Sequence, residues 1–134
     1  EDPLVLVVHR SHALAAQARV PVAALASCRL LMREAGSTTR IVTEQMLARA
    51  GVVPATPMEI GSRESIREAV IRGLGVSVIA RHEVPSHPHL KMLDFEDSSE
   101  EMSEYLYFLR ERRGARLIDA FVAAARSGAQ AMPD

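Results

Sequence analysis

Serine and threonine hydroxyls gather where a glycine precedes a helical pattern. In the stretch Arg33–Arg40, Gly36 is followed directly by Ser37, Thr38 and Thr39. Hydroxyls at the cap and first turn of a helix lie beside backbone amides that have no partner within the helix, and the helix dipole adds about half a positive charge there. Such a helix start could hold a small carboxylate, phosphate or sulfate.

The same residues have a purely structural interpretation, in which the hydroxyls cap the helix and Glu34 supplies any negative charge. Serine and threonine caps are common, so the motif taken alone favours capping. Arg40 favours a ligand, because a cation in the first turn opposes the dipole by roughly 0.3–1 kcal/mol, which a bound anion would offset. Surface exposure or a contact with Glu34 would offset it too, so both interpretations stay open.

A second helix start repeats this pattern further along the chain. Gly61 and Ser62 precede a segment whose apolar stripe contains Ile66 and Val70, and Gly73 ends it. The serine is placed to cap this second helix, as Ser37 is placed to cap the first.

These motifs need strands and helices to position them. The expected helices are Pro21–Leu25, Ser37–Ala50 (ending at Gly51), a segment from Ser62 to Gly73, and a last one beginning near Ala115. Apolar and β-prone runs predict strands at Leu4–Val8, Arg29–Arg33, Met58–Ile60, Gly75–Ala80, Leu90–Phe95 and Tyr105–Leu109. The alternation of strand and helix predicts an α/β fold with a largely parallel sheet.

Composition limits the classes of partner. The net charge of −1 predicts no strong attraction to nucleic acid or an anionic membrane, and no apolar run approaches the ~20 residues that span a bilayer. The single cysteine, Cys28, excludes an internal disulfide and fits the reducing cytoplasm. Because residue 1 is Glu rather than Met, we expect a piece of a longer protein.

Catalytic and metal-binding motifs find no support. We identify no nucleophile elbow, phosphate-loop lysine motif or persuasive carboxylate pair, so we expect no catalytic residue. His82, His87 and His89 lie close together in the sequence, but Pro85 and Pro88 break any helical spacing between them. Without a cysteine partner this group does not predict a metal site. We therefore expect neither a metal nor another cofactor.

Several local patterns occur together in a fixed order. They are Leu4–Val8 followed by His12–Ala15, the Arg33–Arg40 turn, Glu59–Ser62, and Ile66–Arg72 running into Gly73–Ala80. Over roughly residues 3–125 this series closely resembles the effector-binding domain of LysR-type transcriptional regulators. The resemblance implies a fold like type II periplasmic-binding proteins, with two α/β subdomains joined by crossing strands and a small ligand in the cleft.

The resemblance also implies a division of the chain. Residues 1–8 would be a crossover strand, 9–79 effector subdomain II, 80–128 the C-terminal part of subdomain I, and 129–134 a frayed tail. The chain would thus hold one complete Rossmann-like lobe and the closing part of a second. A winged helix-turn-helix, a linker helix and the first part of subdomain I would lie upstream, and the incomplete lobe would favour a homo-oligomer.

Carried over to this sequence, the family's ligand positions fall on the two helix starts. A small anionic effector would bind there and control DNA binding by the missing domain, without a metal. A solute-binding protein of a transporter is the first alternative, and an enzyme on the same fold is the second. The expected ligand-binding residues are Gly36, Ser37, Thr38, Thr39, Arg40, Gly61 and Ser62, with Arg33 and Arg40 tuning the local field.

Overall fold

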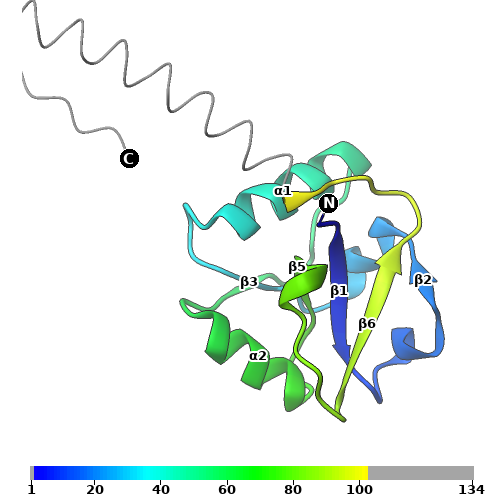
Figure 1. Cartoon of the computed structure of the whole chain (residues 1–134). Helices are drawn as coiled ribbons and strands as arrows, with labels where there is room; N and C mark the ends of the chain where they lie inside the picture. Colours follow the sequence, from blue (N-terminus) through cyan, green and yellow to red (C-terminus); the bar gives the residue numbers. More distant parts are fainter. Residues whose placement is uncertain (1, 103–134) are drawn as a thin grey trace, which may run out of the picture. The chain divides into compact units, whose positions relative to one another are not determined.

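Strand β1 (Leu4–His9) runs through a four-stranded sheet in the computed structural model, which describes residues 2–102 (Figure 1). Its residues Leu4–Val8 are at most 4% exposed, so both faces are covered as the continuous apolar run predicts. Its neighbours are β5 (Ser77–Ala80) and β6 (Leu90–Phe95), and β2 (Arg19–Val20) pairs with the far edge of β6. The expected strand Tyr105–Leu109, the last helix and the tail 129–134 lie outside the described residues.

The expectation of a largely parallel sheet is wrong for this sheet. β1 pairs antiparallel with both β5 and β6, and only β2 lies parallel to β6. The parallel arrangement occurs in the segment between, where β3 (Leu31–Met32) pairs with β4 (Met58–Glu59) and a bridge joins Leu30 to Val76. Strands joined by a helix that crosses over the sheet run parallel, and α1 and α2 join the strands of this segment in that way. β1 and β6 are not joined by such a helix and can pair antiparallel.

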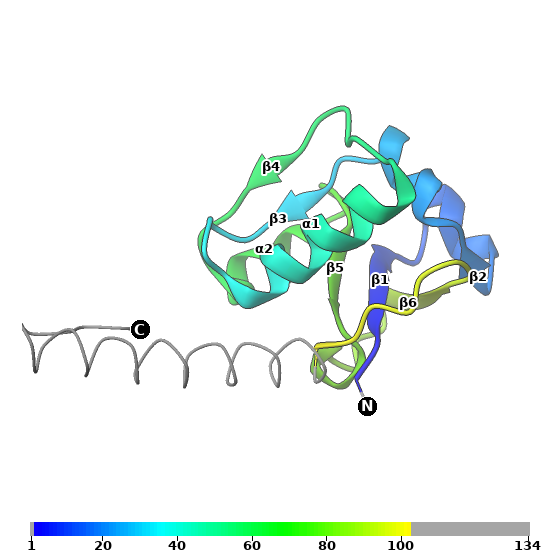
Figure 2. The same cartoon turned by 90° about the horizontal axis from the view of Figure 1, so that it is seen from above.

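Two helices make those connections, and their expected ends are confirmed. α1 (Thr38–Ala50) ends at Gly51, whose φ of +68° suits glycine, and the Val52 amide donates to the Leu47 carbonyl oxygen at 2.9 Å. α2 (Arg63–Ile71) is followed by Gly73 at φ +74°. In Figure 1 α2 lies to the left of β1 and α1 crosses above its upper end, and Figure 2 shows the same elements from above.

A buried cluster joins α2 to the sheet. Val5 and Val7 lie on one face of β1 by strand alternation, and Ile66 and Val70 lie one turn apart on α2. Leu31 of β3 and Ala69 complete the group, and the partly buried Ile79 and Leu90 pack against it. This contact fixes the position of the first turn of α2 relative to β1 and β3.

Three short 3₁₀ helices complete the described part of the chain: η1 (Ala13–Ala16), η2 (Val22–Ser27) and η3 (Arg81–Glu83). The helix expected from Pro21 is η2, which begins one residue later because Pro21 occupies the cap position in an extended conformation. None of the helices within residues 2–102 is long and apolar enough to cross a membrane.

Candidate functional site

A cavity of about 110 Å³ lies between the first turns of α1 and α2, against β1, β3 and β5. One water needs roughly 10–15 Å³ of such space, so the cavity has room for a small metabolite. Its floor belongs to the apolar cluster and includes Val7, Leu31, Ile66, Val70, Ile79 and Leu90. Its charged lining residues are four arginines, Arg33, Arg40, Arg63 and Arg67, and two glutamates, Glu64 and Glu83.

The residues expected to bind the ligand divide into two groups. Thr39 and Arg40 line the cavity. The other five, Gly36, Ser37, Thr38, Gly61 and Ser62, lie in the two turns directly before the lining residues of α1 and α2. The cavity therefore lies between the two predicted helix starts, and its wall begins at the second residue of α1 and the first residue of α2.

The two helix starts differ in how their amides are satisfied. Ser62 accepts a hydrogen bond from the Ser65 amide at 3.0 Å, so the capping interpretation describes α2. Ser37 occupies the cap position of α1 but makes no side-chain cap hydrogen bond. Within residues 2–102 the first backbone bond of α1 runs from the Ile41 amide to the Ser37 carbonyl oxygen, at 3.0 Å. The amides of Thr38, Thr39 and Arg40 therefore have no hydrogen-bond partner among these residues, as is usual for the first turn of a helix without a side-chain cap.

Arg40 is already held by the protein. Its Nη1 donates to Glu59 Oε1 at 2.8 Å and to the Arg33 carbonyl oxygen at 2.9 Å, and its Nε donates to Glu44 at 3.4 Å. The Glu59 carboxylate is the main cause of a raised pKa for Arg40. These contacts offset the cost of a cation at the start of α1 without a ligand, and they replace the contact with Glu34 that the sequence suggested.

Arg33 and Glu34 form a two-point ion pair instead. Arg33 Nε and Nη2 donate to the two carboxylate oxygens of Glu34 at 2.9 and 3.2 Å. This hydrogen bonding raises the pKa of Arg33 and lowers that of Glu34. On α2, Arg63 pairs with Glu83 at 3.5 Å, whereas Arg67 makes no ion pair within the described part of the chain.

Sequence reasoning missed two hydroxyls of the cavity wall. Thr43 and Ser77 are each 3% exposed, and both line the cavity. The Thr43 hydroxyl donates to the Thr39 carbonyl oxygen at 2.7 Å. The available signal was a polar residue inside an apolar pattern, since Thr43 lies among the buried residues of α1 and Ser77 inside β5. A buried hydroxyl needs a hydrogen-bond partner, so a polar residue inside a buried apolar pattern points to a polar network or a cavity.

The histidines considered as metal ligands do not converge. His82 pairs with Asp2, whereas the His87 ring lies 5.4 Å from that of His89, which stacks on His9 at 5.6 Å. Among residues 2–102 no group of three His, Cys, Asp or Glu side chains is arranged to hold a metal ion.

Cys28 is buried, and burial raises the pKa of its thiol.

The sequence of this chain matches a known protein family and several known regulators. A family model described as the LysR substrate binding domain matches residues 1–130. The transcriptional activator CmpR of Synechocystis is 36% identical over 80 residues, which are 60% of this chain and 26% of that protein. The transcriptional regulator CbbR of Rhodospirillum rubrum is 30% identical over 132 residues, or 96% of this chain and 44% of that protein.

A solved structure extends the comparison to three dimensions. The CcmR regulatory domain of Synechocystis PCC6803, in complex with 2-PG, superposes with a TM-score of 0.64 at 33% identity. The match covers 72% of this chain and 48% of that one. This chain thus spans less than half the length of each of these relatives.

Proposed function

This chain belongs to the LysR substrate binding domain family, and from that premise we propose that it senses a small anionic metabolite in the cavity between α1 and α2. Its fold is the periplasmic-binding-protein-like type II fold of LysR effector-binding domains. The curated relatives are transcriptional regulators and not transport proteins, so the comparisons do not favour the alternative of a transporter's solute-binding protein.

One observation carries the proposal, namely that the cavity combines an apolar floor with donors suited to an anion. Four arginines line it, and Thr39 and Ser77 bring hydroxyls, whereas the Thr43 hydroxyl already donates to the Thr39 carbonyl oxygen. The uncapped amides of α1 lie in the same helix turn as Thr39. Guanidinium and hydroxyl donors recognise carboxylate and phosphate oxygens, and an apolar floor strengthens such bonds by excluding water.

The expected ligand-binding residues receive different roles. Thr39 would donate from the cavity wall, and Arg40, held by Glu59, would keep the first turn of α1 in place. Gly36, Ser37 and Thr38 would shape the turn that leaves the α1 amides open. Gly61 and Ser62 would shape the corresponding turn before α2, where Ser62 caps the helix.

Regulation would follow from a change in packing when the ligand binds. We assign the chain no catalytic role and place DNA binding in a helix-turn-helix domain outside this sequence. Ligand binding would alter how two copies of the domain pack in a homo-oligomer, which is a coupling between two sites. Such a regulator would act in the cytoplasm. We retain the division into a crossover strand (1–8), subdomain II (9–79) and part of subdomain I (80–128) as part of this proposal.

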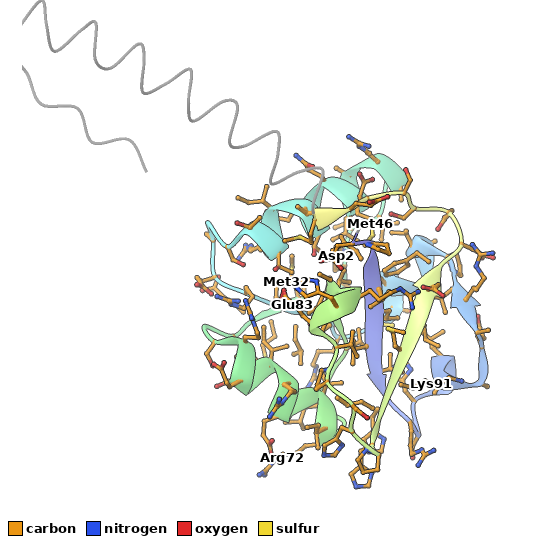
Figure 3. All side chains as sticks on the ribbon, viewed as in Figure 1. Asp2, Met32, Met46, Arg72, Glu83 and Lys91 are labelled. Atoms are coloured by element: carbon orange, nitrogen blue, oxygen red, sulfur yellow. The ribbon has the colours of Figure 1, made fainter. Side chains whose placement is uncertain are left out.

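Calorimetric titration with 2-PG, the ligand named for the CcmR regulatory domain, tests the proposal. We expect saturable binding that weakens at least about tenfold in Arg63→Gln, because a charged hydrogen bond is worth about 1.5–3 kcal/mol. The matched control is Arg72→Gln, since Arg72 follows the far end of α2 and pairs with exposed Glu68 (Figure 3). The absence of saturable binding of both 2-PG and inorganic phosphate at millimolar concentration would overturn it.

A further inference from the structure

The arginines of the cavity wall differ in where their carboxylate partners lie. Arg33 and Arg40 pair with Glu34 and Glu59, which do not line the cavity and whose side chains are 45% and 60% exposed. Arg63 pairs with Glu83, which lines the cavity and is only 18% exposed. Within residues 2–102, Glu83 is thus the one carboxylate in the cavity wall that is paired with a wall arginine.

Glu83 comes from an element that is tied to the segment before β1 and to β6. It ends η3, the short helix between β5 and β6. The Arg81 amide donates to the Pro3 carbonyl oxygen at 2.9 Å, and the Arg81 side chain pairs with Asp94 of β6. Through its pair with Arg63, Glu83 therefore connects η3 to the first turn of α2.

The contact between Glu83 and Arg63 is loose enough to exchange. Its shortest N–O distance is 3.5 Å, whereas charge-assisted hydrogen bonds of this kind are about 2.7–2.9 Å long. An anion with two or three oxygens could approach Arg63 more closely than Glu83 does. It could also reach Arg67, which lines the cavity one turn further along α2 and has no ion-pair partner in the described residues.

Resting on the function proposed above, we propose that Glu83 is an internal counter-ion that selects dianions. In the free domain its carboxylate neutralises Arg63, and a ligand binds by taking its place. A monocarboxylate that displaces Glu83 only exchanges one ion pair for another. A phosphate-type dianion restores the pair with Arg63 and gains a second one with Arg67. The site would therefore take phosphorylated or dicarboxylic ligands and reject monocarboxylates.

The test compares inorganic phosphate with acetate, titrated into the protein and followed by amide NMR shifts. In wild type we expect phosphate to bind more tightly than acetate. In Glu83→Gln both affinities should rise at least about fivefold, since neither anion then has to displace a resident carboxylate. The preference for phosphate over acetate should fall at least about fivefold in Arg67→Gln, which removes the second ion pair. Glu83→Asp, which keeps the charge but shortens the reach, should lie between wild type and Glu83→Gln. Glu34→Gln is the matched control, because Glu34 pairs with Arg33 from outside the cavity, and both affinities should stay within about twofold of wild type.

The outcomes distinguish a failure of the role of Glu83 from a failure of the proposed anion-binding function. Unchanged affinities in Glu83→Gln, or a loss of phosphate affinity there, would overturn the role of Glu83 while leaving the anion site intact. An unchanged preference for phosphate in Arg67→Gln would overturn the selection of dianions. Phosphate binding that appears only after Glu83→Gln would support displacement. If neither anion nor 2-PG binds to any of the proteins, the cavity is not an anion site and both proposals fail.

Discussion

A Cβ atom on Gly75 would lie 2.8 Å from the carbonyl oxygen of Arg29. The same Cβ would lie 2.8 Å from Leu31 Cγ. This is the point where β3 and β5 meet, since the Val76 amide donates to that Arg29 oxygen at 2.9 Å. Glycine is required here because a side chain would not fit, and not because of a positive φ. The close approach of the two backbones brings together two strands that line the cavity.

Gly75→Ala should therefore destabilise the domain. A methyl group in a site without room forces the two strands apart, and such overpacking costs about 1–3 kcal/mol. Urea unfolding measures the change. Gly61→Ala is the control, because a Cβ at Gly61 meets nothing within 4 Å and should change the free energy of unfolding by less than about 0.5 kcal/mol. Equal losses in the two variants would show that the β3–β5 approach is not the cause.

The two cap serines should respond differently to the same substitution. Ser62→Ala removes the bond to the Ser65 amide and should lower the free energy of unfolding by about 0.5–2 kcal/mol. Ser37→Ala removes no side-chain cap bond and should cost less than about 0.5 kcal/mol. Thermal unfolding of both variants is the measurement. A larger loss in Ser37→Ala than in Ser62→Ala would contradict the arrangement of the two helix starts.

Neighbouring threonines on α1 provide a matched pair for ligand binding. Thr39 lines the cavity and Thr38 does not. Thr39→Val should weaken 2-PG binding by about 1–3 kcal/mol, because it leaves a ligand oxygen without its donor. Thr38→Val makes the same chemical change one residue earlier and should leave the affinity within about twofold. Calorimetric titration measures both affinities. A greater loss of affinity in Thr38→Val than in Thr39→Val would show that the ligand does not bind in the cavity.

The pair formed by Arg33 and Glu34 predicts a pH dependence. Arg33 lowers the pKa of Glu34 from its ordinary value of 4.5, so the folded state favours the charged carboxylate. The resulting stability is fully present above that ordinary value and is lost as pH falls through the lower folded value. The melting temperature of wild type should exceed that of Glu34→Gln at about pH 7 and approach it at about pH 3, by a small margin because Glu34 is exposed. A difference that grows on acidification would have the wrong sign.

Features controlled by neighbouring residues could be predicted from the sequence. The end of α1 at Gly51, the cap at Ser62 and the limits of β6 at Leu90 and Phe95 all depend on local backbone preferences and on the period of the apolar pattern. The ordered motifs also indicated the family that the comparisons show. The histidine at position 9 was not considered with His89, because nothing local links two segments that far apart.

The sequence by itself determined where α1 and α2 begin and end, that β1 is buried on both faces, and that two hydroxyl-bearing helix starts exist. Only the tertiary structure decided that β1 runs antiparallel to β5 and β6, that Ser37 leaves its helix uncapped, and that Thr43, Ser77 and Glu83 line one cavity with Thr39. The physical reason is the range of the forces involved. Capping and periodicity act within a few residues, whereas strand pairing and the shape of a cavity arise from contacts between segments that the chain brings together only on folding.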